Sequence, residues 1–339
     1  MYHVRSIKMS GIPHVIGNSN SPRAPFYKRW PESFLKYNSV FAGAIMLYLG
    51  KQKSVYAPDY VKIETTNVCN GKCAYCPRDK MTRDLGVMEY ELFSKIIDEL
   101  VLWKVSSVHL QNYGEPLLDP MLIPRIKCAK SKGIKHVSLF TNGMLLTNSI
   151  AEKLIDSGLD EINISIDVCD EKKHDNLRKN IRYGEITKNL KNLVDIKKLK
   201  ETPNPEITLA SIIHSSNTDD IDHFITRWGG MVKEIHFQRV HDWGLKGSNK
   251  KEYCFPCLRL WTTFTILWDG RVAMCCVDYD GKYILGDVKK SKLRQIWNSD
   301  DYTRIRLLHL SPKLKQVVLC ENCTLRLKDS PLWIKKILF

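Results

Sequence analysis

The stretch Cys69-Asn70-Gly71-Lys72-Cys73-Ala74-Tyr75-Cys76 places three cysteines in one short loop. The loop follows a run of apolar and β-branched residues, Val61 to Thr66, which predicts a strand. A tetrahedral zinc site needs four ligands, usually as two separated pairs, whereas cysteine thiolates are the usual ligands of iron–sulfur clusters. The spacing therefore favours a cubane 4Fe–4S cluster held by Cys69, Cys73 and Cys76. Its fourth iron would stay open to a small chelating molecule.

This loop resembles the signature loop of the radical S-adenosylmethionine (SAM) enzymes. The likeness lies in the cysteine triplet, in Tyr75 directly before the last cysteine, and in the hydrophobic strand before the loop. It implies a reduced cluster that donates one electron to SAM chelated on its open iron, which gives methionine and a 5′-deoxyadenosyl radical. That radical then removes a hydrogen atom from a substrate. The resemblance also implies an electron donor such as flavodoxin or ferredoxin, and it puts Tyr75 among the cofactor-binding residues.

The charge and the cysteine content indicate in which compartment the protein works and what kind of partner it binds. The chain has 339 residues, 11 cysteines and a formal net charge of +15. Residues 1–22 contain no apolar secretory segment, so we expect a cytoplasmic protein whose cysteines bind metal rather than form disulfides. Eleven of the fifteen net charges lie in residues 1–60 and 301–339. This favours an anionic partner, which could be nucleic acid, a phosphorylated small molecule, an acidic peptide or a lipid surface.

An apolar run in the N-terminal region raises the question of membrane contact. The run, Val40 to Leu49, is too short for a bilayer, which takes about 20 residues to cross. It follows a cationic, aromatic stretch, Phe26 to Trp30. The pattern favours a buried helix, with an interfacial helix that holds the protein against a membrane as the alternative.

From Val61 onward, short β-branched runs alternate with helical patterns, which predicts an α/β fold with a parallel sheet. The six candidate strands, enough for a partial (β/α)6 barrel, are Val61–Thr66, Ser106–Asn112, Lys135–Thr141, Glu161–Asp167, Glu206–Ile213 and Lys233–Arg239. The expected domains are a basic N-terminal extension (1–59), a core (60–240), a small cysteine-rich β-hairpin and helix domain (250–325) and a basic tail (326–339).

Polar residues lie where the predicted strands end, and in parallel βα folds the active site lies at that end. The tripeptide Gly114-Glu115-Pro116 follows the second strand. It resembles the glycine-glutamate-proline motif of the same family, which implies that these residues bind SAM and that Glu115 holds its amino group. Tyr113 stands where that motif commonly has another glycine.

Later strand ends add further candidates. Asn142 follows the third strand, either as part of an ordinary turn or in contact with the ligand. Asn163, Ser165 and Asp167 alternate on the fourth strand and can therefore share one face. Ser165 and Asp167 resemble family residues that bind the ribose hydroxyls. Arg178 resembles an arginine that pairs with the SAM carboxylate, which suits its bidentate fork.

A second group of cysteines lies near the C-terminal end: Cys254, Cys257, Cys275, Cys276, Cys320 and Cys323. An alternating run, Trp261 to Trp268, and a turn at Asp269-Gly270 predict a β-hairpin that brings Cys257 and Cys275 together. Cys320 and Cys323 can supply a second pair. Four thiolates would fill all four irons of a second 4Fe–4S cluster and leave no open position.

This second group resembles the auxiliary-cluster domain called SPASM, or its shortened form, twitch. The likeness lies in a C-x12-G-x4-C spacing from Cys257 to Cys275, followed by Leu285-Gly286-Asp287 and Ile296-Trp297. A full SPASM domain has further downstream cysteines for two clusters, so the resemblance implies one auxiliary cluster. Cys254 and Cys276 are possible substitute ligands.

Together the resemblances imply a radical SAM oxidoreductase or maturase. Its substrate would be a sugar-like small molecule or a peptide, with an anionic one favoured by the charge, and its reaction dehydrogenation or cross-linking. A radical SAM epimerase and a nucleic-acid-modifying enzyme are alternatives, although no RNA-binding module is recognisable. A zinc protein built on Cys254, Cys257, Cys320 and Cys323 would leave the first cysteine triplet without a role. The sequence singles out no catalytic residue.

Overall fold

The computed structural model describes residues 6–10, 54, 57–167, 170–213, 220–240, 243, 256–321, 323 and 325. The apolar run 40–49, the candidate ligand Cys254 and the basic tail 326–339 lie outside the described residues.

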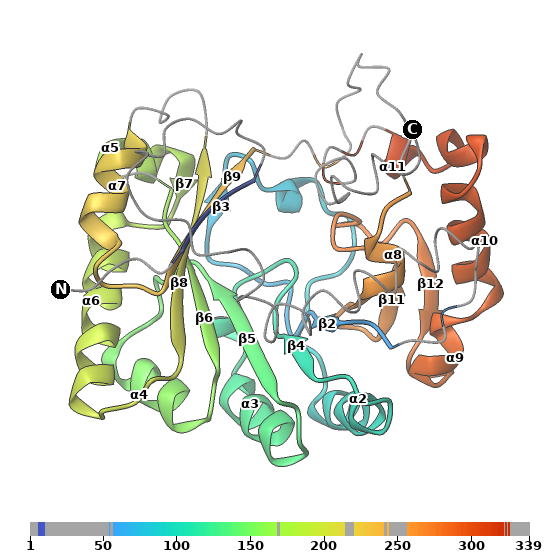
Figure 1. The fold of residues 1–339 in the computed structure, drawn as a ribbon, viewed down its shortest axis with the longest axis horizontal. Helices are drawn as coiled ribbons and strands as arrows, with labels where there is room; N and C mark the ends of the chain where they lie inside the picture. Colours follow the sequence, from blue (N-terminus) through green and yellow to red (C-terminus); the bar gives the residue numbers. More distant parts are fainter. Residues whose placement is uncertain are drawn as a thin grey trace, which may run out of the picture.

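Six parallel strands form the centre of the fold (Figure 1). They are β2 (Tyr60–Ile63), β4 (Ser107–His109), β5 (His136–Thr141), β6 (Glu161–Ser165), β8 (Glu206–Ile213) and β9 (Glu234–Arg239). They lie in the order β9-β8-β6-β5-β4-β2, with every neighbouring pair parallel. The predicted α/β fold with a partial parallel barrel is confirmed.

The helices of the core lie on the outer side of this sheet (Figure 1). They are α2 (Tyr90–Leu102), α3 (Leu122–Ser131), α4 (Asn148–Asp156), α5 (Glu171–Leu177), α6 (Tyr183–Leu199) and α7 (Ile221–Trp228). Apolar residues at helical spacing form the buried face, as in α2, where Phe93, Ile97 and Leu100 are fully buried. They belong to one continuous core that includes strand residues such as Val61 and Val108.

The C-terminal region continues the same sheet. Strand β10 (Thr263–Ile266) pairs in parallel with β2, and β11 (Arg271–Ala273) and β12 (Ile284–Asp287) follow it antiparallel. The predicted strand from Trp261 is wrong at its start, because Arg259–Thr262 form the short helix α8 and the strand begins only at Thr263. Three further helices cover this part: α9 (Leu293–Trp297), α10 (Asp300–His309) and α11 (Val318–Glu321).

Two strand pairings had no signal in the sequence. At the far edge of the sheet, β1 (Ser6–Ser10) pairs in parallel with β9, which brings the sheet to ten strands. Separately, β3 (Lys72–Cys73) pairs antiparallel with β7 (Arg178–Lys179). The second pairing attaches the cysteine loop directly to the segment that contains Arg178.

A buried ion pair joins the core to the C-terminal region. Both oxygens of Glu64 accept hydrogen bonds from Arg83, at 2.6 and 2.7 Å, and both side chains are almost fully buried. Glu64 also accepts from the backbone N–H of Trp268, beyond β10, while Arg83 donates to the carbonyl of Tyr279 at 2.7 Å. Burial raises the pKa of Glu64, and the guanidinium of Arg83 opposes that rise. The pair therefore ties the segment after the cysteine loop to the C-terminal hairpin.

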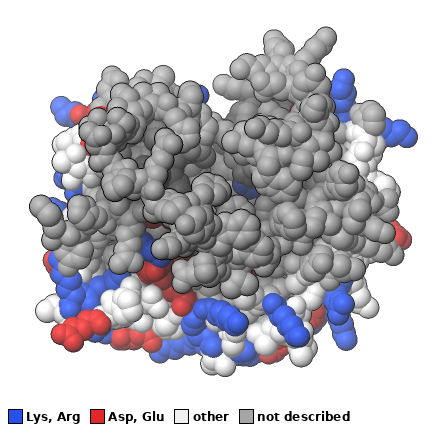
Figure 2. Space-filling model, viewed as in Figure 1, with Lys and Arg blue, Asp and Glu red and all other residues white. Residues whose placement is uncertain are grey.

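Charges on the described surface are mixed. Figure 2 shows Lys and Arg side chains interspersed with Asp and Glu along the lower rim of the molecule. Several are paired, as Lys130 is with Asp160 and Lys132 with Asp98, both at 2.7 Å. Within the described residues, no helix combines the length and the apolar character needed to cross a bilayer.

Candidate cofactor and metal centres

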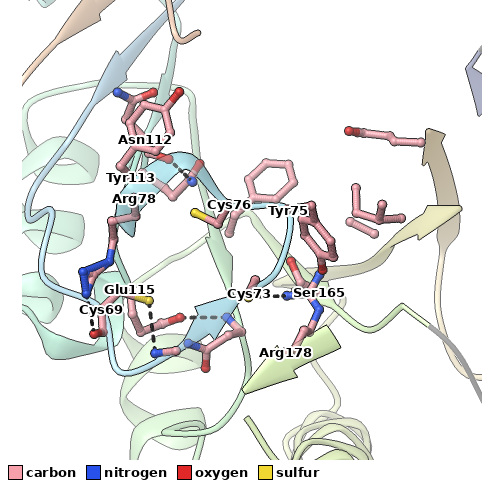
Figure 3. A pocket seen from close by; sticks show the side chains of 18 of the residues that line it. Cys69, Cys73, Tyr75, Cys76, Arg78, Asn112, Tyr113, Glu115, Ser165 and Arg178 are labelled. Carbon is pink, nitrogen blue, oxygen red and sulfur yellow. Dashed lines mark hydrogen bonds between the residues drawn. The ribbon is translucent and has the colours of Figure 1, made fainter. Parts of the chain in front are cut away.

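The three cysteines of the loop after β2 line one cavity at the carboxyl ends of the strands (Figure 3). Its volume is about 450 Å³. The predicted residues on its lining are Cys69, Cys73, Tyr75, Cys76, Gly114, Glu115, Asn142, Ser165 and Arg178. The fold thus gathers residues from widely separated parts of the chain. Two other predicted residues, Pro116 and Asp167, are not on this lining.

Backbone contacts fix the shape of the cysteine loop. The N–H of Ala74 donates to the carbonyl of Leu177 at 2.8 Å, next to the β3–β7 pairing. Arg78 donates to the carbonyl of Cys69 at 3.0 Å, and the N–H of Gly71 donates to the sulfur of Cys69 at 3.4 Å. These contacts tie the loop to the segment before Arg178 and bring its two ends together.

The thiols themselves suit an iron–sulfur cluster. Burial raises the pKa of Cys73 to about 11, and it also raises the pKa values of Cys69 and Cys76. The free thiols are thus protonated, and a metal would displace the protons as it binds. Three soft sulfur donors around a cavity with room for a further molecule match a cluster with one open iron.

Glu115 is 1% exposed, and its carboxylate faces the cavity between three donors. It accepts hydrogen bonds from the Thr141 hydroxyl at 2.7 Å, the Asn142 N–H at 2.7 Å and the Leu117 N–H at 3.1 Å. Burial nevertheless raises the pKa of Glu115 to about 7. Glycine at position 114 lets the backbone before Glu115 pass close to Thr66. Its φ is 114°, and a Cβ there would lie 2.5 Å from the carbonyl oxygen of Thr66.

Arg178 lines the cavity and forms a buried ion pair with Asp167, which lies behind it. Two nitrogens of Arg178 donate to the two carboxylate oxygens of Asp167, at 2.6 and 2.8 Å. The Tyr75 hydroxyl and the Ile212 N–H donate to the same carboxylate. Burial alone would raise the pKa of Asp167, but Arg178 outweighs it and holds the pKa below the usual value. The predicted contacts of Asp167 with ribose and of Arg178 with a carboxylate stay predictions.

The remaining predicted residues divide between the cavity and its surroundings. Ser165 lines the cavity, whereas Asn163 does not and donates to Glu161 at 3.0 Å. Asn142 donates to the side chain of Asn70 at 2.7 Å, which ties the end of β5 to the cysteine loop. The contacts of Ser165 and Asn142 with SAM are untested predictions.

Other lining residues were missed at the sequence level. Asn112 is 8% exposed, and its side-chain N–H2 group has no partner among the described residues. Its place directly before Tyr113 was a usable signal. Trp243 donates to the carbonyl of Tyr75 at 2.7 Å, and Arg259 comes from α8. Long-range folding brings these two to the cavity, so no local pattern could have indicated them.

The second predicted ligand set lines a small apolar cavity of about 20 Å³. Its four cysteines are Cys257, Cys275, Cys320 and Cys323. His309 lines it too and accepts from the N–H of Cys257 at 3.1 Å. Among the described residues, no three His, Cys, Asp or Glu side chains converge closely enough to hold a single ion. The support for a cluster with no open position is the number of thiols on one lining, since four would ligate all four irons.

The two adjacent cysteines of the C-terminal hairpin are placed differently. Cys275 lines the second cavity, and burial raises its pKa well above the ordinary value. The N–H of Val277 donates to the Cys275 sulfur at 3.4 Å. Cys276 is absent from that lining, and its sulfur instead accepts from Arg259 at 3.0 Å. Cys275 is therefore the better placed of the two to act as a ligand.

The two cavities share part of their lining. Arg259 and Leu325 line both of them. Tyr113 lines the first cavity and donates its hydroxyl to the carbonyl of Cys276 at 2.8 Å. Burial raises the pKa of Tyr113 well above its ordinary value, so the hydroxyl remains a donor. The two sites are thus direct neighbours.

Comparisons with known proteins match both parts. A family model described as the radical SAM superfamily matches residues 63–220, and one described as an iron–sulfur cluster-binding domain, SPASM, matches residues 257–324. The GTP 3′,8-cyclase of Chlorobaculum tepidum is 32% identical over 172 residues, which are 49% of this chain and 49% of the cyclase. The match thus spans about half the length of that relative.

A second relative is similar over more of its length. The tungsten-containing aldehyde ferredoxin oxidoreductase cofactor-modifying protein of Pyrococcus furiosus is 23% identical over 318 residues, 79% of this chain and 87% of the relative.

Solved structures share the fold at low sequence identity. The structure of anSMEcpe with bound AdoMet has a TM-score of 0.61 at 16% identity and covers 80% of this chain and 91% of its own. BtrN in complex with AdoMet and 2-DOIA has a TM-score of 0.56 at 17% identity, and the match covers 79% of this chain and 93% of BtrN. SuiB of Streptococcus suis bound to its precursor peptide SuiA has a TM-score of 0.60 at 13% identity, and the match covers 97% of this chain and 82% of SuiB.

Proposed function

Because the chain belongs to the radical SAM superfamily and has a C-terminal SPASM domain, we propose that it oxidises a C–H bond of a sugar-like small molecule or a peptide. These domains imply a 4Fe–4S cluster, SAM and auxiliary iron–sulfur chemistry. When bound, the cluster and SAM supply a 5′-deoxyadenosyl radical that removes a hydrogen atom from the substrate. A donor such as flavodoxin or ferredoxin would provide the electron that this requires.

The residues of the first cavity would hold these groups. Cys69, Cys73 and Cys76 would bind three irons, which leaves the fourth for SAM. Glu115 would accept the SAM ammonium group, since a buried carboxylate gains most from a cationic partner. Because Asp167 already binds Arg178 through both oxygens, we expect it to position the arginine and Tyr75 from behind the wall.

The oxidation proposal rests on the closeness of the two cavities. Arg259 and Leu325 line both, so a substrate in the first cavity would lie next to the cysteines of the second. Hydrogen abstraction leaves one unpaired electron on a substrate carbon. That electron would pass to the auxiliary cluster and a proton would leave to water, so the substrate loses two hydrogen atoms in all.

Cations on the lining support an anionic group on the substrate. Among the described residues, the cavity lining has two acidic side chains, Asp79 and Glu115, and five cationic ones, of which Arg178 is already paired with Asp167; the other four are Lys72, Arg78, Arg239 and Arg259. One SAM carboxylate would use part of this excess, and an anionic substrate group would use the rest. The cyclase relatives have an anionic nucleotide, GTP, in their name.

Mass spectrometry of candidate substrates tests the proposal. The reconstituted protein would be incubated anaerobically with SAM and a reductant, in deuterated water, with a panel of acidic peptides, aminocyclitols and GTP. Oxidation predicts a product lighter by two hydrogen atoms, formed with one 5′-deoxyadenosine for each product. In the Cys320→Ala/Cys323→Ala variant, SAM cleavage should persist while this product disappears.

The same experiment can overturn the proposal. A product of unchanged mass apart from one solvent deuterium would replace oxidation with epimerisation. Oxidised product formed at the wild-type rate by the double variant would remove the auxiliary cluster from the reaction.

A further inference from the structure

Tyr113 connects the first cavity to the ligand turn of the second. Its side chain is 5% exposed and lines the first cavity, and its hydroxyl donates to the carbonyl oxygen of Cys276 at 2.8 Å. The resembling motif commonly has a glycine at this place, and a glycine has no side chain with which to make this bond. The contact therefore depends on the tyrosine that this chain has at position 113.

The carbonyl that Tyr113 contacts belongs to a peptide group with a second partner. The N–H of the same peptide group is that of Val277, and it donates to the sulfur of Cys275 at 3.4 Å. A hydrogen bond at the oxygen of an amide polarises the amide and strengthens the bond that its N–H donates. One peptide group thus passes the effect of the Tyr113 hydroxyl to the Cys275 sulfur.

The surroundings keep Tyr113 in this position. Its backbone N–H donates to Glu64 at 3.2 Å, and Glu64 is itself held by Arg83. The ring of Tyr113 packs against the rings of Trp243 and Tyr279, and the distances between ring centroids are 5.8 and 6.2 Å. The hydroxyl is therefore aimed at the Cys276 carbonyl by contacts on both the backbone and the ring.

We propose that Tyr113 is a positioning residue that raises the reduction potential of the auxiliary cluster through the Cys276–Val277 peptide group. The proposal rests on the proposed function, in which Cys275 is a ligand of that cluster. Hydrogen bonds to the sulfurs are among the features that set cluster potentials. An N–H donated to a thiolate stabilises the reduced cluster more, since reduction adds negative charge. The Tyr113 bond therefore favours electron acceptance.

A redox titration of the full reconstituted chain tests this. The midpoint potential of each cluster would be measured by electron paramagnetic resonance in the wild type and in Tyr113→Phe, which removes only the hydroxyl. We expect the auxiliary midpoint to move to a more negative potential, with iron content unchanged. The matched control is Tyr279→Phe, whose ring packs against Tyr113 but whose hydroxyl makes no hydrogen bond among the described residues. It should keep the wild-type potential.

A second variant tests the sign of the effect. With 3,5-difluorotyrosine at position 113, a stronger donor of nearly the same shape, the auxiliary midpoint should move to a more positive potential. This variant decides the question even if Tyr113→Phe fails to hold the auxiliary cluster. Equal potentials in the wild type and the variants that hold both clusters would overturn the inference and leave the proposed function standing. A wild type that binds only one cluster would instead overturn the proposed function.

Discussion

The two cysteine sites use the same ligand chemistry in opposite surroundings. The loop site opens into a cavity of about 450 Å³ whose lining includes many charged and polar side chains, whereas the C-terminal site encloses about 20 Å³ among mostly apolar side chains, with Arg259 and His309 also on its lining. Three thiols line the first and four line the second. The loop thiols thus have room beside them for a further molecule, whereas the C-terminal thiols enclose almost none, and we expect the first site to bind a cofactor and the second to serve electron transfer.

The largest expected effect breaks the open site. Replacing Cys69, Cys73 and Cys76 with alanine should abolish SAM cleavage, because the open iron disappears with its cluster. Iron should fall from about eight to about four per chain, since two cubane clusters hold eight irons. Iron analysis and 5′-deoxyadenosine formation measure both results. Unchanged cleavage would refute the assignment of the loop cysteines.

The next prediction concerns the ion pair that joins the core to the C-terminal region. Arg83→Ala leaves Glu64 as a buried, unpaired carboxylate, and it removes the hydrogen bond to Tyr279. We expect a loss of about 3–5 kcal/mol in the free energy of unfolding. Urea unfolding measures it, with the exposed Arg294→Ala as a control that should stay within about 0.5 kcal/mol of the wild type. A change as small in Arg83→Ala as in the control would contradict the role of the pair.

A smaller effect sharpens the account of the open site. Glu115→Gln should weaken SAM binding by about 1.5–3 kcal/mol, the range for a lost hydrogen bond to a charged group. Both clusters should keep their iron, because Glu115 binds neither. Equilibrium dialysis with labelled SAM gives the affinity. If the variant binds SAM as tightly as the wild type, another residue must hold the ammonium group.

The smallest effect is a pH dependence confined to the open site. Burial raises the pKa of Glu115 to about 7, so the SAM-free protein holds a proton there below that pH. SAM favours the ionised form, and its affinity should therefore fall by roughly tenfold per pH unit below about 7. A glutamine at position 115 should remove this slope. A raised carboxyl pKa also means that the SAM-free fold loses stability as pH rises from about 4.5 to about 7.

Sequence patterns located the cysteines and the strands better than they located contacts. The bounds of β8 were predicted correctly, because its β-branched run is bounded by turn residues. The pairing of β10 with β2 was not foreseen, since two segments about 200 residues apart share no local pattern. For the same reason, the place of Arg259 on the cavity lining could not be predicted from the sequence. The resemblance to the radical SAM family made Asp167 and Arg178 candidate site residues, but only the folded chain shows that they bind each other.

The parallel ladder between β2 and β10 limits how the protein can move. Residues Tyr60 to Ile63 pair in register with Thr263 to Ile266, and the N–H of Glu64 continues the ladder to Ile266 at 2.9 Å. A hinge between the two regions would have to break these bonds inside a buried sheet, where unpaired backbone groups are costly. The separation of the two cluster sites is thus a fixed length of the scaffold. Adaptation to a new substrate would have to come from the loops at the strand ends, with that length unchanged.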